Sequence, residues 1–301
     1  MVAAYAFLVW LLAGLLTQGW WGQLMLLGVA VYLMIELSNS NALMRVRSRM
    51  VSCVFLTLSC TSVAWFSSYT CGLLALCLVA ALYILFHAYQ NTSAAGPVYY
   101  AFLLLGIATI AFVPLLYFIP LFWVLMTSQL QLMSWRTWLA SLFGLLTPYW
   151  LCIPWLLFRQ EGALIAAHFK GFGHLEHPFD WSVVSACQIV TLLFVVALLA
   201  LAMVHFWHYS FEEKIRNRQI FGFFFYVSVF ALLFLIVQPQ HYYQLLRIVL
   251  VSSSPLVAHF FVHTHTKATN ILFWSATAFS LLLTISQLFF SQYLCIFDAM
   301  L

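Results

Sequence analysis

The sequence predicts an all-α membrane protein, a polytopic transmembrane bundle with about eleven membrane segments. Hydrophobic residues make up 65% of the 301 residues and charged residues 6%, whereas a soluble domain has about 45–50% apolar and about 25% charged residues. Such a chain has more apolar surface than a soluble core can bury, so lipid must be its main solvent. An aromatic content of 18%, with 12 Trp and 14 Tyr, is typical of proteins that meet two lipid–water interfaces.

Apolar runs follow one another along the whole chain. A membrane helix needs about 20 apolar residues, with a range of about 17–25. The first run lacks the basic segment and the cleavage site of a signal peptide, so we expect it to be a retained helix. We assign the single spans to residues 3–18, 22–38, 51–67, 72–89, 137–157, 182–207, 220–237, 245–263 and 269–291.

The apolar stretch 98–130 is too long for one helix. Pro114 and Pro120 lie near its middle, and proline ends or kinks a helix because it removes a backbone donor and clashes with the preceding turn. We therefore predict a proline-broken hairpin of two short helices, at about 98–112 and 114–130. The sequence leaves open whether this hairpin crosses the membrane fully.

The Lys and Arg residues of the loops set the orientation, because cytoplasmic loops carry an excess of them. We place the basic loop that follows the second span in the cytoplasm and alternate sides from there, which puts eight basic residues inside and three outside. The N-terminus is then cytoplasmic and the C-terminus external. The three external residues are Arg159, Lys170 and Arg247, and the eight internal ones are Arg45, Arg47, Arg49, Arg136, Lys214, Arg216, Arg218 and Lys267.

The charge pattern also supports the hairpin, because a single pass over 98–130 would move Arg136 and every later internal basic residue to the outside. We expect one integral-membrane domain, residues 1–301, whose largest external loop is 159–181. No basic run of the kind that binds nucleic acid is present, so membrane lipids are the expected partners, and the sequence does not indicate a protein partner.

Two stretches resemble a known family. They are SNSNALMRVRSRM, residues 38–50, and WRTWLASLFGLLTPYWL, residues 135–151. Together with the broken hairpin, their order resembles an uncharacterised family of polytopic inner-membrane proteins of Bacteroidota-type bacteria. The resemblance implies a multi-pass protein of a bacterial inner membrane. The hairpin and the following W-R turn are also similar to the membrane core of polyprenyl-phosphate-dependent glycosyltransferases, an analogy of fold that does not fix function.

One polar island, HFKGFGHLEHPFDWS at residues 168–182, first suggests a metal site. Imidazole and carboxylate groups suit zinc or iron. However, glycines and Pro178 interrupt regular structure there, and the orientation puts the histidines at 205, 208, 263 and 265 on the other side of the membrane. We therefore predict an irregular interfacial loop, no metal and no cofactor. The pair His263 and His265 is interpreted as part of a polar turn.

The same external face suggests chemistry on a lipid-linked phosphate. Arginine binds phosphate oxygens bidentately, and a carboxylate can accept the proton of an attacking hydroxyl. The candidate phosphate ligands are Arg159, Arg247 and His241, and the candidate catalytic carboxylates are Glu161, Glu176 and Asp180. The opposing interpretation is that these side chains anchor helix ends at the headgroups.

Three functional classes remain open. The first is a glycosyltransferase-like protein that handles a polyprenyl-phosphate-linked sugar at the external face. The second is a transporter or flippase of an envelope precursor, in which Glu36, a lone carboxylate in an apolar helix, couples to protons. The third is a non-catalytic subunit of an envelope assembly complex. The sequence does not decide whether the protein is an enzyme.

Overall fold

The computed structural model describes residues 1–44, 48–173, 178–209, 211, 213–263 and 267–298. Over these residues the regular structure is helical, which confirms the all-α prediction. The α-helices are α1 (Val2–Leu12), α2 (Leu15–Gln18), α3 (Trp21–Ser40), α4 (Met50–Cys60), α5 (Tyr69–His87), α6 (Ala95–Ala111), α7 (Ile119–Ser128), α8 (Trp135–Phe158), α9 (Gly162–Gly173), α10 (Ala186–Tyr209), α11 (Ile215–Val237), α12 (Tyr242–His263) and α13 (Lys267–Asp298). Short 3-10 turns are η1 (Ala64–Ser67), η2 (Val113–Phe118), η3 (Trp181–Val183) and η5 (Pro239–His241).

Seven of the described helices are long and apolar enough to cross a membrane, namely α3, α5, α8, α10, α11, α12 and α13. Four shorter apolar segments accompany them: α1, α4, α6, and the stretch formed by η2 and α7. Large apolar side chains such as Phe143, Trp150 and Phe158 of α8 are exposed, and water would be a poor solvent for them. The chain is therefore a multi-span helical membrane protein.

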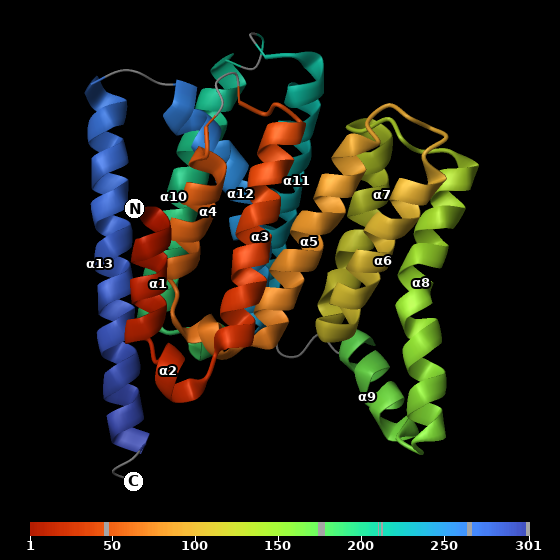
Figure 1. The fold of residues 1–301 in the computed structure, drawn as a ribbon, viewed down its shortest axis with the longest axis horizontal. Coiled ribbons are helices and arrows are strands. Elements are labelled where there is room, and N and C mark those ends of the chain that lie inside the picture. The colour runs from red at the N-terminus through yellow and green to blue at the C-terminus, as the bar shows by residue number, and fades with distance from the viewer. Residues whose placement is uncertain (45–47, 174–177, 210, 212, 264–266, 299–301) are drawn as a thin grey trace.

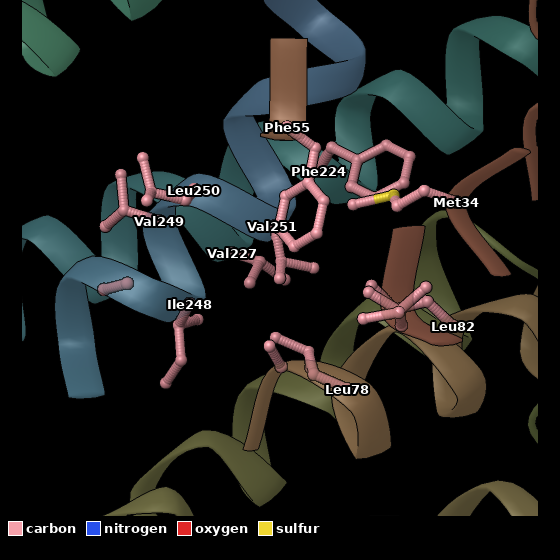
Figure 2. Close-up of a cluster of buried hydrophobic side chains, with 14 of the residues drawn as sticks. Met34, Phe55, Leu78, Leu82, Phe224, Val227, Ile248, Val249, Leu250 and Val251 are labelled. Carbon is pink, nitrogen blue, oxygen red and sulfur yellow. The ribbon is translucent and has the colours of Figure 1, made fainter. Parts of the chain in front are cut away.

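The core of the bundle lies around α12. Every residue of this helix from Leu245 to Phe260 is buried, and α12 lies among α4, α5, α10 and α11. Figure 2 shows aliphatic and aromatic side chains gathering there from α3, α4, α5, α11 and α12. A helix at the centre of a membrane bundle is buried all round, because its whole surface meets other helices.

The proline-broken hairpin is present. The helix α6 ends at Ala111, and Phe112 takes an extended conformation before η2 and α7 return alongside (Figure 1). Pro114 and Pro120 each stand in the first turn of η2 or α7, where a missing backbone donor is tolerated. The backbone N–H of Gln90 donates to the carbonyl of Leu130 at 3.0 Å, which joins the two open ends of the hairpin region.

The helices α6 and α8 pack closely through reciprocal glycines. A Cβ atom added at Gly144 would lie 2.4 Å from the carbonyl oxygen of Tyr99, and one at Gly106 would lie 2.8 Å from that of Leu145. Small residues allow helix backbones to approach in membranes. Ser134 caps α8 through a reciprocal capping box with Thr137.

Apart from the short helices α2 and α9, successive helices alternate in direction, so most loops fall at two ends of the bundle (Figure 1). We call the end at which α3 finishes and α11 begins the basic end. There, the Arg216 guanidinium donates to Asn41 Oδ1 at 2.7 Å and to the carbonyl of Phe86 at 3.0 Å. The starts of α8 and α13 lie at this end as well, so Arg136 and Lys267 share it with Lys214 as the charge pattern predicted. Arg45 and Arg47 lie outside the described residues.

Two sequence-predicted spans are interrupted. The run 3–18 breaks into α1 and α2 at Gly14, whose φ of 106° is a left-handed conformation that favours glycine. The run 51–67 gives only α4, which stops at Cys60 before η1. With 11 residues, α4 rises about 16 Å, which is about half the hydrocarbon thickness of a bilayer.

The predicted irregular loop 159–181 is corrected by the structure, because α9 occupies Gly162–Gly173. The glycines that suggested irregularity, at 171 and 173, stand in the last turn of this helix, where they do not break its middle. The helix α9 packs against α8 and η2. Only the end of the polar island remains irregular in the described residues.

Candidate functional site

Arg247 lies in the second turn of the central helix α12 and is only 1% exposed. Sequence analysis placed it on the external side of the membrane as a candidate phosphate ligand, with anchoring at the headgroups as the opposing interpretation. In the structure its side chain instead enters the junction between α4, η1 and α12. A cation inside a membrane bundle is rare and by default marks a functional site.

The break between α4 and α5 forms the wall that faces this arginine. Thr61, Val63 and Trp65 are buried although their backbone is not α-helical. Buried irregular backbone must find hydrogen-bond partners inside the protein. Thr284 of α13 donates to the carbonyl of Cys60 at 3.1 Å, and Gln287 accepts from the N–H of Val63 at 3.0 Å. The helix α13 therefore stabilises the broken end of α4.

The guanidinium of Arg247 makes two well-defined contacts. Its Nη1 donates to Ser59 Oγ at 2.6 Å, and its Cζ lies 3.3 Å from the ring centroid of Trp65. A cation over an indole face is stabilised by the ring quadrupole, by about 2 kcal/mol or more when water is excluded. Trp65 is held in turn by Trp10 and Phe66 and donates from Nε1 to the carbonyl of Ser59 at 3.2 Å.

The charge of Arg247 is not balanced by a carboxylate within the described residues. Among the described residues, the Nε and Nη2 atoms of Arg247 have no hydrogen-bond partner. The carboxyl end of α4 supplies a partial negative charge of about half an elementary unit. Removing a cation from water costs several kcal/mol, and good pairing is needed to offset that cost. Two free donors on a buried cation thus form an incomplete site for an anion.

A hollow lies on the other side of α4, between α1, α4, α10, α12 and α13. Its volume is about 200 Å³, which is below the range of about 300–1,000 Å³ that is usual for small-molecule sites. The lining is almost entirely apolar. Leu58, the neighbour of Ser59, and Ser280, one turn from Thr284, both line it. The hollow therefore ends within one turn of the groups around Arg247.

The other predicted phosphate ligands do not join Arg247. Arg159 is exposed at the end of α8, where its Cζ lies 5.0 Å from the ring of Trp155. His241 lies in η5 and packs its ring against Phe112 at 5.3 Å. Both lie at the same end of the bundle as the start of α12, but Arg159 belongs to the separate corner formed by α8 and α9 (Figure 1).

The candidate carboxylates are also separated. Glu161 is exposed beside Arg159 at the α8–α9 corner, and Glu176 lies outside the described residues. Asp180 accepts from the N–H of Ser182 at 3.1 Å and from its hydroxyl at 2.5 Å. Its turn is joined to the end of α11 by a backbone bond from Phe179 to Val237, 3.0 Å long. Of the described candidates, Asp180 is therefore the carboxylate that the fold brings toward the start of α12.

The polar island contributes a histidine to the α8–α9 corner. His168 Nε2 lies 3.5 Å from the hydroxyl of Tyr149, and Tyr149 donates to Thr109 at 3.0 Å. Partial burial lowers the pKa of His168 below its usual value. The His168 ring packs against the rings of Tyr149 and Phe169 at 5.8 and 5.5 Å, which indicates a role in helix packing.

Glu36, the candidate for proton coupling, lies in the last two turns of α3 and is partly exposed. Its helix ends at the basic end of the bundle, far from the start of α12 (Figure 1). Ser59 and Trp65, in contrast, were missed by sequence analysis. The available signal was the polar run SCTS followed by a tryptophan inside an apolar stretch.

The fold and this site define a multi-span helical membrane protein with a buried cation beside a broken helix. No protein-family model, curated protein or solved structure matches the chain, so no family is identified.

Proposed function

We propose that this protein binds a phosphate-bearing lipid, with the phosphate at Arg247 and the hydrocarbon chain in the hollow beside α4. The observation that carries the proposal is a fully buried guanidinium with two donors that have no partner in the described part of the chain. A phosphate offers several oxygens to such a fork and forms charge-assisted hydrogen bonds with it. The ligand class is that of a polyprenyl phosphate or a polyprenyl-phosphate-linked sugar.

The apolar hollow supports a lipid rather than a free phosphate. Its lining from Met50 to Leu58 of α4 runs along the helix toward Ser59, which contacts Arg247. A ligand that places an isoprenoid chain along this helix would bring its phosphate to the broken end. Burial of the hydrocarbon chain contributes about 25 cal/mol of binding free energy per Å² of apolar surface. The contact of the phosphate with Arg247 then favours the phosphorylated lipid over the uncharged alcohol.

A glycosyltransferase-like reaction is the first use that we propose for this site. Asp180 would accept the proton of an acceptor hydroxyl as that oxygen bonds to the sugar. The bond from the sugar to the phosphate breaks, and the polyprenyl phosphate leaves with its charge held by Arg247. Glu161 and Arg159 take no part in this proposal, because their corner of the bundle is separate from α12.

The broken helix favours a second use, movement of the lipid-linked precursor across the membrane. Transporters commonly bind substrate where a helix is interrupted. The helix α4 ends beside Arg247, and because the dipole at a carboxyl end is negative, Arg247 and not the helix end would hold the phosphate. A transporter of this type would use Arg247 without needing Asp180, and the variant Asp180→Asn separates the two uses by abolishing transfer alone.

The binding proposal predicts a preference of the wild-type protein for the charged lipid. In detergent, polyprenyl phosphate is expected to bind at least about 30-fold more tightly than the matching uncharged polyprenol, as loss of one buried charge-assisted contact costs about 2–5 kcal/mol. Binding is measured by native mass spectrometry of the full chain. The variant Arg159→Met is the control and should keep the preference. Equal binding of phosphate and alcohol contradicts the proposal, as does binding of inorganic phosphate alone with equal affinity.

We also propose that the protein lies in a bacterial inner membrane, with the basic end in the cytoplasm and the site of Arg247 toward the external side. In a background with Cys152→Ser, which removes an exposed cysteine, Thr17→Cys should react with an impermeant maleimide in intact spheroplasts. Ser93→Cys, exposed at the basic end, should react only after permeabilisation. The reverse pattern contradicts this orientation.

A further inference from the structure

The geometry points to a zinc site at the basic end of the bundle, formed by Glu213, His259 and His263. It is separate from the site of Arg247, which lies toward the other end of α12. One ligand atom from each of the three residues lies within 4.8 Å of the others. Sequence analysis predicted no metal, and it examined the histidines of the polar island instead.

The arrangement follows from the helical repeat. His259 and His263 are four residues apart on α12, so both side chains lie on one face, and their ring centroids are 4.3 Å apart. Glu213 comes from the connection between α10 and α11, immediately before α11 begins. Its carboxylate lies beside the two imidazoles.

The separations suit a shared ion. Glu213 Oε1 lies 3.5 Å from His259 Nε2. Two ligands bound tetrahedrally to zinc at about 2.0–2.1 Å lie about 3.3–3.4 Å from each other. The present separation needs a change of only a few tenths of an ångström to match this value. It is also long for a charge-assisted hydrogen bond, which is about 2.7–2.9 Å.

The burial of the Glu213 and His259 side chains also supports a metal site. The Glu213 side chain is 4% exposed and that of His259 is 2% exposed. Buried carboxylates are rare and are normally paired with a cation or bound to a metal. Phe206 and Phe221 pack against the His259 ring at 5.7 and 4.8 Å. These aromatic neighbours fix the orientation of the His259 ring.

The ligand set selects the class of metal. Two imidazoles and one carboxylate are a set that binds zinc and leaves a fourth position open. An open hollow lined by His205, His208 and Phe260 lies beside the cluster, and the His205 ring is 6.2 Å from that of His259. His265 lies outside the described residues and takes no part in the inference.

The test measures zinc bound by the purified full-length protein after removal of metal with a chelator. We expect one Zn²⁺ per chain and a loss of at least about 100-fold in affinity in His263→Ala and in Glu213→Gln, since each removes one of three ligands. His168→Ala, at the other end of the bundle, should bind zinc as the wild type does. Thermal unfolding of each variant without zinc shows whether it is folded.

Cobalt gives a second readout on the wild-type protein, which needs no substitution. Bound Co²⁺ should show the visible absorption bands of a tetrahedral site, and zinc should displace it. Failure of the wild type to bind one zinc per chain, or unchanged affinity in both His263→Ala and Glu213→Gln, would show only a His–Glu ion pair and overturn the inference. A loss of zinc in His168→Ala would overturn it too.

Discussion

The substitution Arg247→Met is expected to abolish binding of polyprenyl phosphate and to leave the unliganded protein at least as stable as the wild type. The buried guanidinium has one hydrogen bond to Ser59 and aromatic contacts with Trp65 and Phe55, but no carboxylate partner in the described residues. Methionine fills a similar volume without a charge. Replacing a buried ion by a hydrophobic residue often stabilises a protein by about 1–4 kcal/mol.

Arg247→Met should weaken lipid binding without lowering the thermal midpoint, and this combination distinguishes a ligand-binding arginine from a structural one. Loss of the charged contact should weaken binding of the phosphate lipid by about 30-fold or more, because such contacts contribute about 2–5 kcal/mol. The thermal midpoint without lipid should rise or stay unchanged. Both are measured on purified protein in the same detergent, by lipid titration and by thermal unfolding.

The alternative role of Arg247 is to balance the dipole at the carboxyl end of α4. A purely structural cation predicts that Arg247→Met lowers the thermal midpoint and leaves lipid affinity unchanged. Arg159→Met serves as the matched control, because Arg159 also lies over a tryptophan ring but is exposed. It should alter neither quantity.

The substitution Gly144→Ala is expected to destabilise the packing of α8 on α6 strongly. The new Cβ would lie 2.4 Å from the carbonyl oxygen of Tyr99 and 3.1 Å from the amide nitrogen of Leu103. Both are backbone atoms, so no side-chain rotation can relieve the overlap and the helices must separate. Overpacking of this kind costs about 1–3 kcal/mol and sometimes more, which should appear as a lower thermal midpoint and a smaller folded fraction.

Gly28→Ala is the matched control for this prediction. No heavy atom lies within 4 Å of a Cβ added at that position, and alanine is the better helix former. The control should leave stability unchanged or slightly higher, measured by fluorescence-detected size exclusion after heating. If Gly144→Ala behaves like Gly28→Ala, then α6 and α8 do not approach as closely as the structure shows.

The helical segments could be predicted from sequence because each depends on local properties. Apolar runs set the number of segments, and Pro114 and Pro120 set the position of the hairpin. The placement of Arg136 then favoured a return of the chain, and the structure has that return. These signals are strong in membrane proteins, because the bilayer fixes the length and polarity of every span.

The broken end of α4 could not be predicted in this way. The run 51–67 has the composition of a complete span, and its interruption depends on α13, which supplies Thr284 and Gln287 as hydrogen-bond partners of the buried backbone groups. Arg247 is buried for the same reason, because the early end of α4 makes room for its side chain. Contacts between residues so far apart in the chain leave no recognisable pattern in the local sequence.

The cluster of Glu213, His259 and His263 was also only partly predictable from the sequence. The i,i+4 spacing of the two histidines is visible in the sequence, but the carboxylate comes from a different connection. The orientation rule assigned His263 to the cytoplasmic side without bringing it together with Glu213 and His259. Their proximity follows from how α10, α11 and α12 pack.

The most direct test of the central claim is an experimental structure of the protein in lipid nanodiscs with polyprenyl phosphate. The account predicts phosphate density beside Arg247, with oxygens about 2.7–2.9 Å from Nε or Nη2, and a chain that continues into the hollow along α4. A bound phosphate at Arg159 or elsewhere, with Arg247 unchanged on Ser59 and Trp65, would contradict it.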